Sequence, residues 1–209
     1  MTRKPSSFKC NNLEIQTHPE VYDPAEDTFL LLEEIDPHVE DSVFEIGSGT
    51  GIIALYCVQE GANVICSDIN PFAVDLIKKN YKKNKSQLTG SLEIRKGSLF
   101  DVLLKDETFN LIVFNPPYLP TSKEEYVGGN GWFDKAVSGG KNGLETTKPF
   151  LQQLPKYLRD DGRSFTIVSS KSPRIEFDQT IKKNNLKSTI VSSQSFTDET
   201  LEVHKIIKK

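Results

Sequence analysis

The residues best suited to chemistry form a rigid turn, Asn-Pro-Pro-Tyr, directly after the apolar run 111–114. Pro116 and Pro117 end the preceding strand and stiffen the turn. The Asn115 side chain and the Pro116 carbonyl each supply a hydrogen-bond acceptor, and Tyr118 offers a flat ring face. A planar NH₂ group, as in a carboxamide or an adenine, needs two acceptors to fix its orientation. The turn therefore predicts a site that orients such a group.

This arrangement suits methyl transfer to a poorly nucleophilic nitrogen. Two acceptors that hold both hydrogens direct the nitrogen lone pair at the methyl group and stabilise the positive charge that develops on nitrogen. No general base is needed before transfer, in agreement with the absence of histidine near the motif. The structural alternative is a strand that simply ends in an Asn-Pro turn.

A glycine-rich turn within residues 43–51, VFEIGSGTG, is the second candidate site. Gly47, Gly49 and Gly51 allow the backbone to turn tightly and approach a ligand closely. The spacing G-x-G-x-G differs from the dinucleotide fingerprint G-x-G-x-x-G, which places a pyrophosphate at a helix N-terminus. Glu45, just before the glycines, would repel a pyrophosphate and attract a cationic sulfonium or ammonium group. The turn therefore indicates S-adenosylmethionine rather than NAD.

A second acidic residue supports this interpretation. Asp68 lies 23 positions after Glu45, at the end of the next predicted strand. An acid at that place accepts hydrogen bonds from ribose hydroxyls. The plain alternative is that both acids are ordinary strand-end residues, but their combination with the glycines favours a cofactor site.

The elements that must position both turns are apolar strands alternating with helices. This pattern predicts βαβ units and a mainly parallel sheet covered on both faces. The connection before the last strand is too short for a parallel crossover, so we expect six parallel strands and one antiparallel strand. The predicted strands are 43–47, 63–69, 91–95, 110–114, 164–169, 188–192 and 199–207, and the predicted helices are 52–60, 71–84, 146–158 and 173–184. The glycine-rich loop 119–143 falls outside this pattern.

The composition is typical of one globular domain. The chain has 209 residues, of which 36% are hydrophobic and 26% charged, and the net charge of −3 is not that of a dedicated nucleic-acid binder. It has no run long enough to span a membrane, no secretory signal and no CxxC pair among three cysteines, which favours a cytoplasmic protein. Its three histidines form no metal motif. We predict a single domain over 1–209, with an N-terminal lid or helix segment (1–40) and a catalytic α/β core (41–209).

Several stretches resemble the HemK-type glutamine methyltransferases, and in particular the short eukaryotic and archaeal branch that acts on the class I translation release factor. These stretches are residues 21–35, 45–55, 67–74, 113–120 and 138–145. The Asn-Pro-Pro-Tyr motif is shared with DNA and RNA amino-methyltransferases, whereas the sequence PAEDTFLLL is more specific to this branch. The resemblance implies the Rossmann-like fold of class I S-adenosylmethionine-dependent methyltransferases, with a seven-stranded sheet whose last strand is antiparallel.

The resemblance also implies a reaction and a set of contacts. S-adenosylmethionine would donate a methyl group to the side-chain amide nitrogen of the glutamine in the Gly-Gly-Gln motif of the release factor. Asn115 matches the residue that touches both cofactor and substrate, and the rest of its turn would contact the substrate. The other matched cofactor contacts are Thr28, Glu45, Gly47 and Asp68.

One position departs from the family pattern. After the third strand, the family usually has an acidic residue that binds the adenine amine, followed by an apolar one. Here Ser98 precedes Leu99, and Asp101 follows three positions after Ser98. A serine hydroxyl accepts a hydrogen bond more weakly than a carboxylate does. The sequence leaves open whether Ser98 or Asp101 contacts the adenine.

Members of this branch work as heterodimers with a small zinc-binding activator protein that pairs along an edge of the sheet. In the expected strand order the strand at 91–95 is an edge, and an unpaired edge needs covering. Because Leu92 and Ile94 lie on this strand, we expect poor solubility of the chain alone. The zinc would belong to the partner. Recognition of the substrate would come from the N-terminal segment, the loop 119–143 and the partner.

Two other functions compete with this interpretation. The same turn can hold the exocyclic amine of a flipped base in a nucleic-acid amino-methyltransferase. A lysine cluster at 78–85 and the C-terminal sequence KIIKK would then bind phosphates. Against this, the cluster falls on a helix predicted to be exposed, and no target-recognition domain is visible. A non-enzymatic scaffold is disfavoured because Glu45, Asp68 and Asn115 are all intact.

Overall fold

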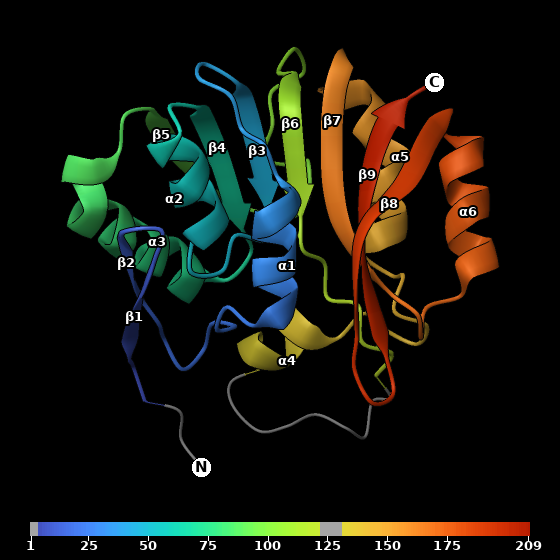
Figure 1. Cartoon of the computed structure of the whole chain (residues 1–209), viewed down its shortest axis with the longest axis horizontal. Helices are drawn as coiled ribbons and strands as arrows, with labels where there is room; N and C mark the ends of the chain where they lie inside the picture. Colours follow the sequence, from blue (N-terminus) through green and yellow to red (C-terminus); the bar gives the residue numbers. More distant parts are fainter. Residues whose placement is uncertain (1–3, 122–130) are drawn as a thin grey trace.

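A computed structural model describes residues 4–121 and 131–209, and a seven-stranded sheet forms its centre (Figure 1). The strand order is β5-β4-β3-β6-β7-β9-β8, and β9 runs antiparallel to both of its neighbours. The predicted arrangement of six parallel strands and one antiparallel strand is therefore confirmed. The strands are β3 (Ser42–Ile46), β4 (Asn63–Asp68), β5 (Ser91–Lys96), β6 (Phe109–Phe114), β7 (Leu158–Ser169), β8 (Leu186–Ser195) and β9 (Thr200–Lys208).

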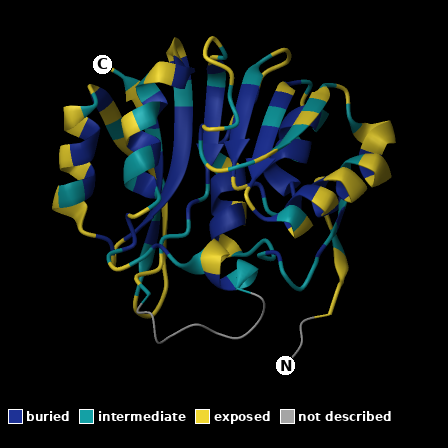
Figure 2. Ribbon diagram, turned by 180° about the vertical axis from the view of Figure 1, so that it is seen from behind, coloured by how far each residue is buried: buried dark blue, intermediate teal, exposed yellow. Residues whose placement is uncertain are grey.

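Helices cover both faces of the sheet, so the central strands are apolar on both sides. In β6, Leu111 and Val113 join the core on one face, and Ile112 and Phe114 join the core on the other. Figure 2 shows the resulting buried centre, with exposed residues on the outer helices. The first face carries α1 (Glu26–Glu34), α2 (Ile52–Gln59) and α3 (Pro71–Asn84), and the second carries α5 (Thr147–Tyr157) and α6 (Arg174–Lys183).

Four short elements lie where the sequence predicts none. A hairpin of β1 (Ser7–Cys10) and β2 (Leu13–Gln16) occupies part of the predicted lid segment 1–40. Its turn residues Asn11 and Asn12 both have positive φ, at 47° and 66°, as a tight hairpin turn requires. The Asn-Asn pair before the alternating Leu13 and Ile15 was the available signal. The other elements are the short helix α4 (Trp132–Val137), inside the predicted loop, and the 3₁₀ turn Lys85–Gln87.

Buried asparagines of α3 fasten the hairpin to the domain. Asn84 Oδ1 accepts from Glu14 N at 2.8 Å, and Asn80 Oδ1 accepts from Gln16 N at 2.9 Å. The Asn80 amide also donates to the Thr50 carbonyl at 2.9 Å, in the glycine-rich turn. These bonds satisfy backbone amide hydrogens at the free edge of β2, and they place the segment that follows β2 over the glycine-rich turn.

Two strands extend well beyond their predicted bounds. β7 begins at Leu158 rather than 164, and β8 covers Leu186–Ser195 rather than 188–192. The added residues are mostly polar and exposed, so apolar patterning could not detect them. Helix α5 contains both Pro149 and Pro155. Pro149 is tolerated because it lies in the first turn, where the amide hydrogen has no intrahelical partner, whereas Pro155 lies inside the helix, near its end.

Within the described residues, no helix is long and apolar enough to cross a membrane. In the same part of the chain, no group of three or more His, Cys, Asp or Glu is arranged to hold a metal ion.

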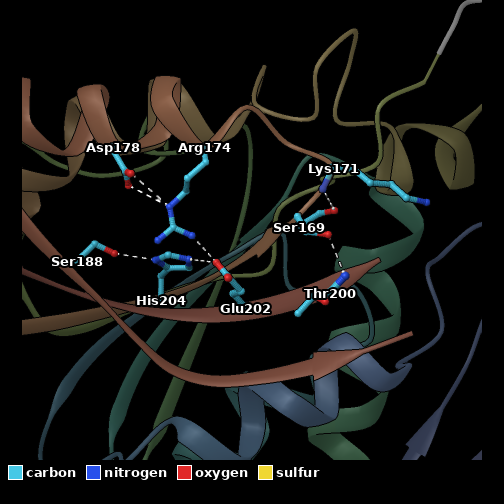
Figure 3. A network of polar contacts seen from close by, with 9 residues as sticks. Ser169, Lys171, Arg174, Asp178, Ser188, Thr200, Glu202 and His204 are labelled. Atoms are coloured by element: carbon cyan, nitrogen blue, oxygen red, sulfur yellow. Dashed lines mark hydrogen bonds and ion pairs between the residues drawn. The ribbon is translucent and has the colours of Figure 1, made fainter. Parts of the chain in front are cut away.

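A buried histidine links the C-terminal strands to α6 (Figure 3). His204 of β9 is 1% exposed and lies with its Nε2 3.0 Å from Glu202 Oε2 and its Nδ1 2.8 Å from Ser188 Oγ. Its ring meets Phe177 of α6 edge-on at 4.8 Å between centroids. Burial lowers the pKa of His204 below its ordinary value of 6.5, although Glu202 acts in the opposite direction.

We expect this histidine to make folding stability depend on pH. The unfolded chain binds a proton at His204 below about pH 6.5, while the folded chain does so only at lower pH. The free energy of unfolding should therefore fall as pH drops from 7 through 6.5, and His204→Gln should remove this part of the dependence. Urea denaturation of both proteins across that range measures the difference. If the free energies of unfolding of the two proteins changed with pH in parallel, His204 would not be the source of the pH dependence.

Candidate active site

A cavity of about 880 Å³ opens at the carboxyl ends of β3, β4 and β6. This is where ligands bind in open α/β sheets. Figure 1 shows α4 just beyond these strand ends. The cavity brings together nearly all of the predicted site residues: Thr28, Glu45, Gly47, Gly49, Asp68, Ser98, Leu99, Asn115, Pro116, Pro117 and Tyr118.

One predicted contact, Gly51, and the open alternative to Ser98, Asp101, fall outside the described cavity lining. Gly51 is the N-cap of α2, with φ of 81°, and a Cβ there would meet Ile77 at 3.1 Å. Glycine at this position allows the chain to turn and to pack against α3. Asp101 is exposed, whereas Ser98 lines the cavity, so the structure favours Ser98 as the residue that faces a ligand.

The glycine-rich turn wraps backbone around the cavity. Gly47 and Gly49 have φ of 65° and 54°, a conformation that side chains disfavour. Ser48 N donates to the Ser67 carbonyl at 3.0 Å, which fixes the turn to the end of β4. The N-terminal segment lies against this turn, since a Cβ at Gly49 would be in ordinary van der Waals contact, at 3.8 Å, with the Tyr22 carbonyl oxygen.

Glu45 is a buried carboxyl group at the base of the cavity. It is 3% exposed, and its Oε2 accepts from Ala54 N of α2 at 3.0 Å. Burial raises the pKa of Glu45 from 4.5 to about 8, and the nearby Asp68 also acts to raise it. Near neutral pH the carboxyl group therefore holds a proton, which a bound cation would displace.

Asp68 is held rigidly at the end of β4. Its two carboxylate oxygens accept from Gly49 N at 2.9 Å and from Asn70 N at 2.8 Å. Each oxygen keeps a further lone pair, so the carboxylate can still accept from a ligand in the cavity. Burial raises the pKa of Asp68, but the two backbone hydrogen bonds lower it.

The Asn-Pro-Pro-Tyr turn leaves one buried acceptor unused. Asn115 Nδ2 donates to Asp27 Oδ2 at 3.1 Å, whereas Asn115 Oδ1 is buried and has no hydrogen-bond partner among the described residues. Buried polar atoms are nearly always paired in folded proteins, so an unpaired acceptor on a cavity wall indicates a ligand donor. Tyr118 Oη donates to the same Asp27 oxygen at 3.2 Å. Burial, followed by Asp27, raises the pKa of Tyr118 well above 10, so its hydroxyl stays neutral.

Asp27 is the site residue that sequence reasoning missed. It is 3% exposed at the start of α1 and lines the cavity beside Thr28. The available signal was its place next to Thr28 in the sequence PAEDT, although a first-turn acid is also typical of ordinary helices.

A glycine segment supports the Asn-Pro-Pro-Tyr turn from behind. A Cβ at Gly139 would lie 2.8 Å from the Pro117 carbonyl oxygen, and one at Gly143 would lie 2.4 Å from the Tyr118 carbonyl oxygen. Gly139 N donates to the Leu119 carbonyl at 2.8 Å. This close approach gives a structural role to the predicted stretch 138–145. Of the predicted loop 119–143, residues 122–130 lie outside the described residues, while Trp132 and Lys135 line the cavity mouth.

Comparisons with known proteins agree with this geometry. The methyltransferase small domain family matches residues 12–195. A Methanocaldococcus jannaschii protein named as an N5-glutamine methyltransferase is 39% identical over 156 residues, covering 74% of this chain and 75% of that protein. The human methyltransferase HEMK2 is 31% identical over 198 residues and 90% of each chain. The chain belongs to the HemK-type methyltransferases of this family. Its resemblance to that group is thereby confirmed.

A solved structure shows that the methyltransferase fold is shared. The chain is similar to a chain of the E. cuniculi Mtq2–Trm112 complex, described as responsible for the methylation of the eRF1 translation termination factor. The TM-score is 0.67 at 20% identity, over 91% of this chain and 99% of that one. At this identity the likeness supports the class I methyltransferase fold alone.

Proposed function

We propose that this methyltransferase uses S-adenosylmethionine to methylate the side-chain amide nitrogen of the glutamine in the Gly-Gly-Gln motif of a translation release factor. The observation that carries the proposal is the unpaired, buried Oδ1 of Asn115 on the cavity wall. The names of the relatives support the substrate class, since glutamine methylation and eRF1 methylation are stated for two of them.

The cavity residues fit the cofactor. The bound cofactor supplies a methyl group on a cationic sulfonium. Glu45 offers a buried carboxyl group that ionises beside a cation, and Asp68 offers acceptors for ribose hydroxyls. The remaining cofactor contacts that we propose are Thr28, Gly47, Gly49, Ser98, Leu99 and Asn115, all of which line the cavity.

The Asn-Pro-Pro-Tyr turn would bind and orient the substrate amide. Asn115 Oδ1 and the Pro116 carbonyl accept its two N–H hydrogens, so that its nitrogen lone pair is directed at the methyl group. The same acceptors would stabilise the positive charge that develops on nitrogen as the N–C bond forms and the methyl–sulfur bond breaks, with the sulfur leaving as a neutral thioether. One amide hydrogen is then released to water as a proton. Tyr118 remains neutral and covers the planar amide.

The nucleic-acid alternative receives less support from the structure. The lysines at 78, 79, 82, 83 and 85 are exposed on α3 and the turn after it, and none of them is among the described residues that line the cavity. Lys83 forms an ion pair with Glu14 at 2.7 Å, and Lys85 lies over the Tyr81 ring at 4.6 Å. These contacts are typical of a solvated helix face.

One assay tests the proposal. A labelled methyl donor is incubated with release factor, with a variant release factor in which the motif glutamine is asparagine, and with bulk RNA. We expect incorporation into the glutamine form only. Incorporation into RNA, or transfer that survives Asn115→Ala, would overturn the proposed function.

The exposed edge of the sheet supports a further part of the proposal, a small activator partner that carries its own zinc in a cytoplasmic heterodimer. β5 is an edge strand, as expected. Leu92 and Ile94 are only half-buried, packed partly against the core, so they leave some apolar surface at that edge. We expect the chain alone to be poorly soluble. A stable, active monomer in light scattering would contradict this.

We expect Ser98→Asp to tighten cofactor binding. Ser98 is exposed at the cavity, where a carboxylate would accept a hydrogen bond from the adenine amine more strongly than a hydroxyl does. Charged hydrogen bonds contribute about 1.5–3 kcal/mol against about 1 kcal/mol for neutral ones, so we expect a gain of about two- to thirtyfold in affinity. Calorimetry measures it, with Asp101→Asn as a control that should change little. An unchanged affinity in Ser98→Asp would argue against the assigned adenine position.

A further inference from the structure

The buried Asp27 carboxylate accepts hydrogen bonds from both the N-terminal segment and the Asn-Pro-Pro-Tyr turn. Its Oδ1 accepts from Thr28 N at 2.6 Å, from Thr28 Oγ1 at 3.2 Å and from Tyr22 Oη at 3.3 Å. Its Oδ2 accepts from Asn115 Nδ2 at 3.1 Å and from Tyr118 Oη at 3.2 Å. Every partner donates, as an ionised carboxylate requires. The Asp27 carboxylate therefore links α1 to Asn115, which lies 88 positions away in the sequence.

We propose that Asp27 is a positioning residue that fixes which way the Asn115 amide faces, and that it is the reason why this turn carries asparagine rather than aspartate. The inference rests on the proposed function, in which Asn115 Oδ1 accepts from the substrate amide.

The polarity of the hydrogen bonds fixes this orientation. An asparagine side chain has a donor end and an acceptor end of nearly equal size. Because Asp27 only accepts, the amide NH₂ must face it, and Oδ1 must face the cavity. In the flipped orientation, Oδ1 would lie about 3.1 Å from a carboxylate oxygen, with no proton between them. The flipped NH₂ would also meet the N–H groups of the substrate amide, donor against donor.

Hydrogen-bond polarity also explains why aspartate does not suit position 115. A carboxylate there would still offer an acceptor to the cavity, but its other oxygen would lie against the Asp27 carboxylate. Two buried like charges at such a distance are strongly unfavourable. If Asp27 is exchanged for asparagine at the same time, the new NH₂ at position 27 can donate to the new carboxylate at position 115. The donor–acceptor pair is restored with its polarity reversed, and the cavity keeps its acceptor.

The reversed pair gives a direct test in four proteins: wild type, Asp27→Asn, Asn115→Asp and the double variant. We expect each single variant to lower kcat for release-factor methylation by about 10- to 100-fold, with a smaller change in KM, because one charge-assisted hydrogen bond is lost. We expect the double variant to recover at least tenfold over either single variant. Glu26→Gln, the same chemical change at the exposed neighbour on α1, should leave kcat unchanged.

A second measurement does not depend on activity. In NMR spectra of the free wild-type protein, one proton of the Asn115 side-chain NH₂ should be shifted downfield by its carboxylate acceptor, and Asp27→Asn should remove the shift. Asn115→Ala assigns the signal. If the wild type failed to methylate the release factor, the proposed function would fail, and this spectrum would still decide the pairing.

Two results would overturn the role of Asp27: an unshifted Asn115 signal in wild type, or a double variant no more active than Asn115→Asp. The second comparison holds even if Asp27→Asn alone does not fold, because both of the proteins compared carry the Asn115→Asp substitution.

Discussion

Asn115→Ala should abolish most methyl transfer while leaving the fold in place. The substitution removes the buried acceptor that faces the cavity, and with it the stabilisation of charge on the attacking nitrogen. Loss of one such preorganised hydrogen bond typically lowers kcat by about 100- to 1000-fold. Asp27 keeps its bonds from Thr28 and Tyr118, so the variant should still fold.

The experiment separates chemistry from binding. Single-turnover transfer to the release factor measures the chemical step, and calorimetry measures cofactor affinity. Asn110→Ala is a matched control: Asn110 lies at the opposite end of β6, where its Oδ1 accepts from Ser42 N at 3.0 Å. The Asn110→Ala substitution should lower the stability of the fold but leave the rate of methyl transfer unchanged. Equal rates in the two variants would refute the role given to Asn115.

The sequence predicts the parts of this fold that depend on apolar burial. The runs 110–114 and 63–69 must lie inside because both faces of the sheet are covered, and the structure confirms them as β6 and β4. The short last connection is enough to predict the antiparallel β9. These inferences need only the local sequence and the rule that parallel strands require a crossover.

The missed features depend on contacts between distant residues. The amide hydrogens of β2 are satisfied by Asn80 and Asn84, more than 60 positions away, and no local pattern shows this. Similarly, Asp27 acquires its role only because α1 lies against the Asn-Pro-Pro-Tyr turn. The type of Gly51 fits a turn around the cofactor, whereas its tight contact with Ile77 depends on the three-dimensional packing.

Glu45→Gln should have two opposite effects, and the first is on cofactor binding. A cationic ligand binds the ionised carboxylate, yet in the cofactor-free protein this group holds a proton below about pH 8. Cofactor affinity in wild type should therefore rise by up to about tenfold per pH unit towards pH 8 and then level off. In Glu45→Gln the affinity should be lower by about 10- to 100-fold above pH 8 and nearly independent of pH. Calorimetry between pH 6 and 9 measures both curves.

The second effect is on the stability of the cofactor-free protein. The pKa of Glu45 is higher in the folded chain, about 8, than its ordinary 4.5, so its contribution to stability is complete below pH 4.5 and is lost as pH rises through 8. A neutral glutamine avoids this loss, so Glu45→Gln should be more stable than wild type at pH 9. Glu60→Gln, at an exposed carboxyl at the end of α2, is the matched control and should change neither property. A variant that binds cofactor weakly without gaining stability at pH 9 would show that Glu45 is already ionised before the cofactor binds. Both effects together would show that the buried carboxyl group destabilises the folded chain and is retained for ligand binding.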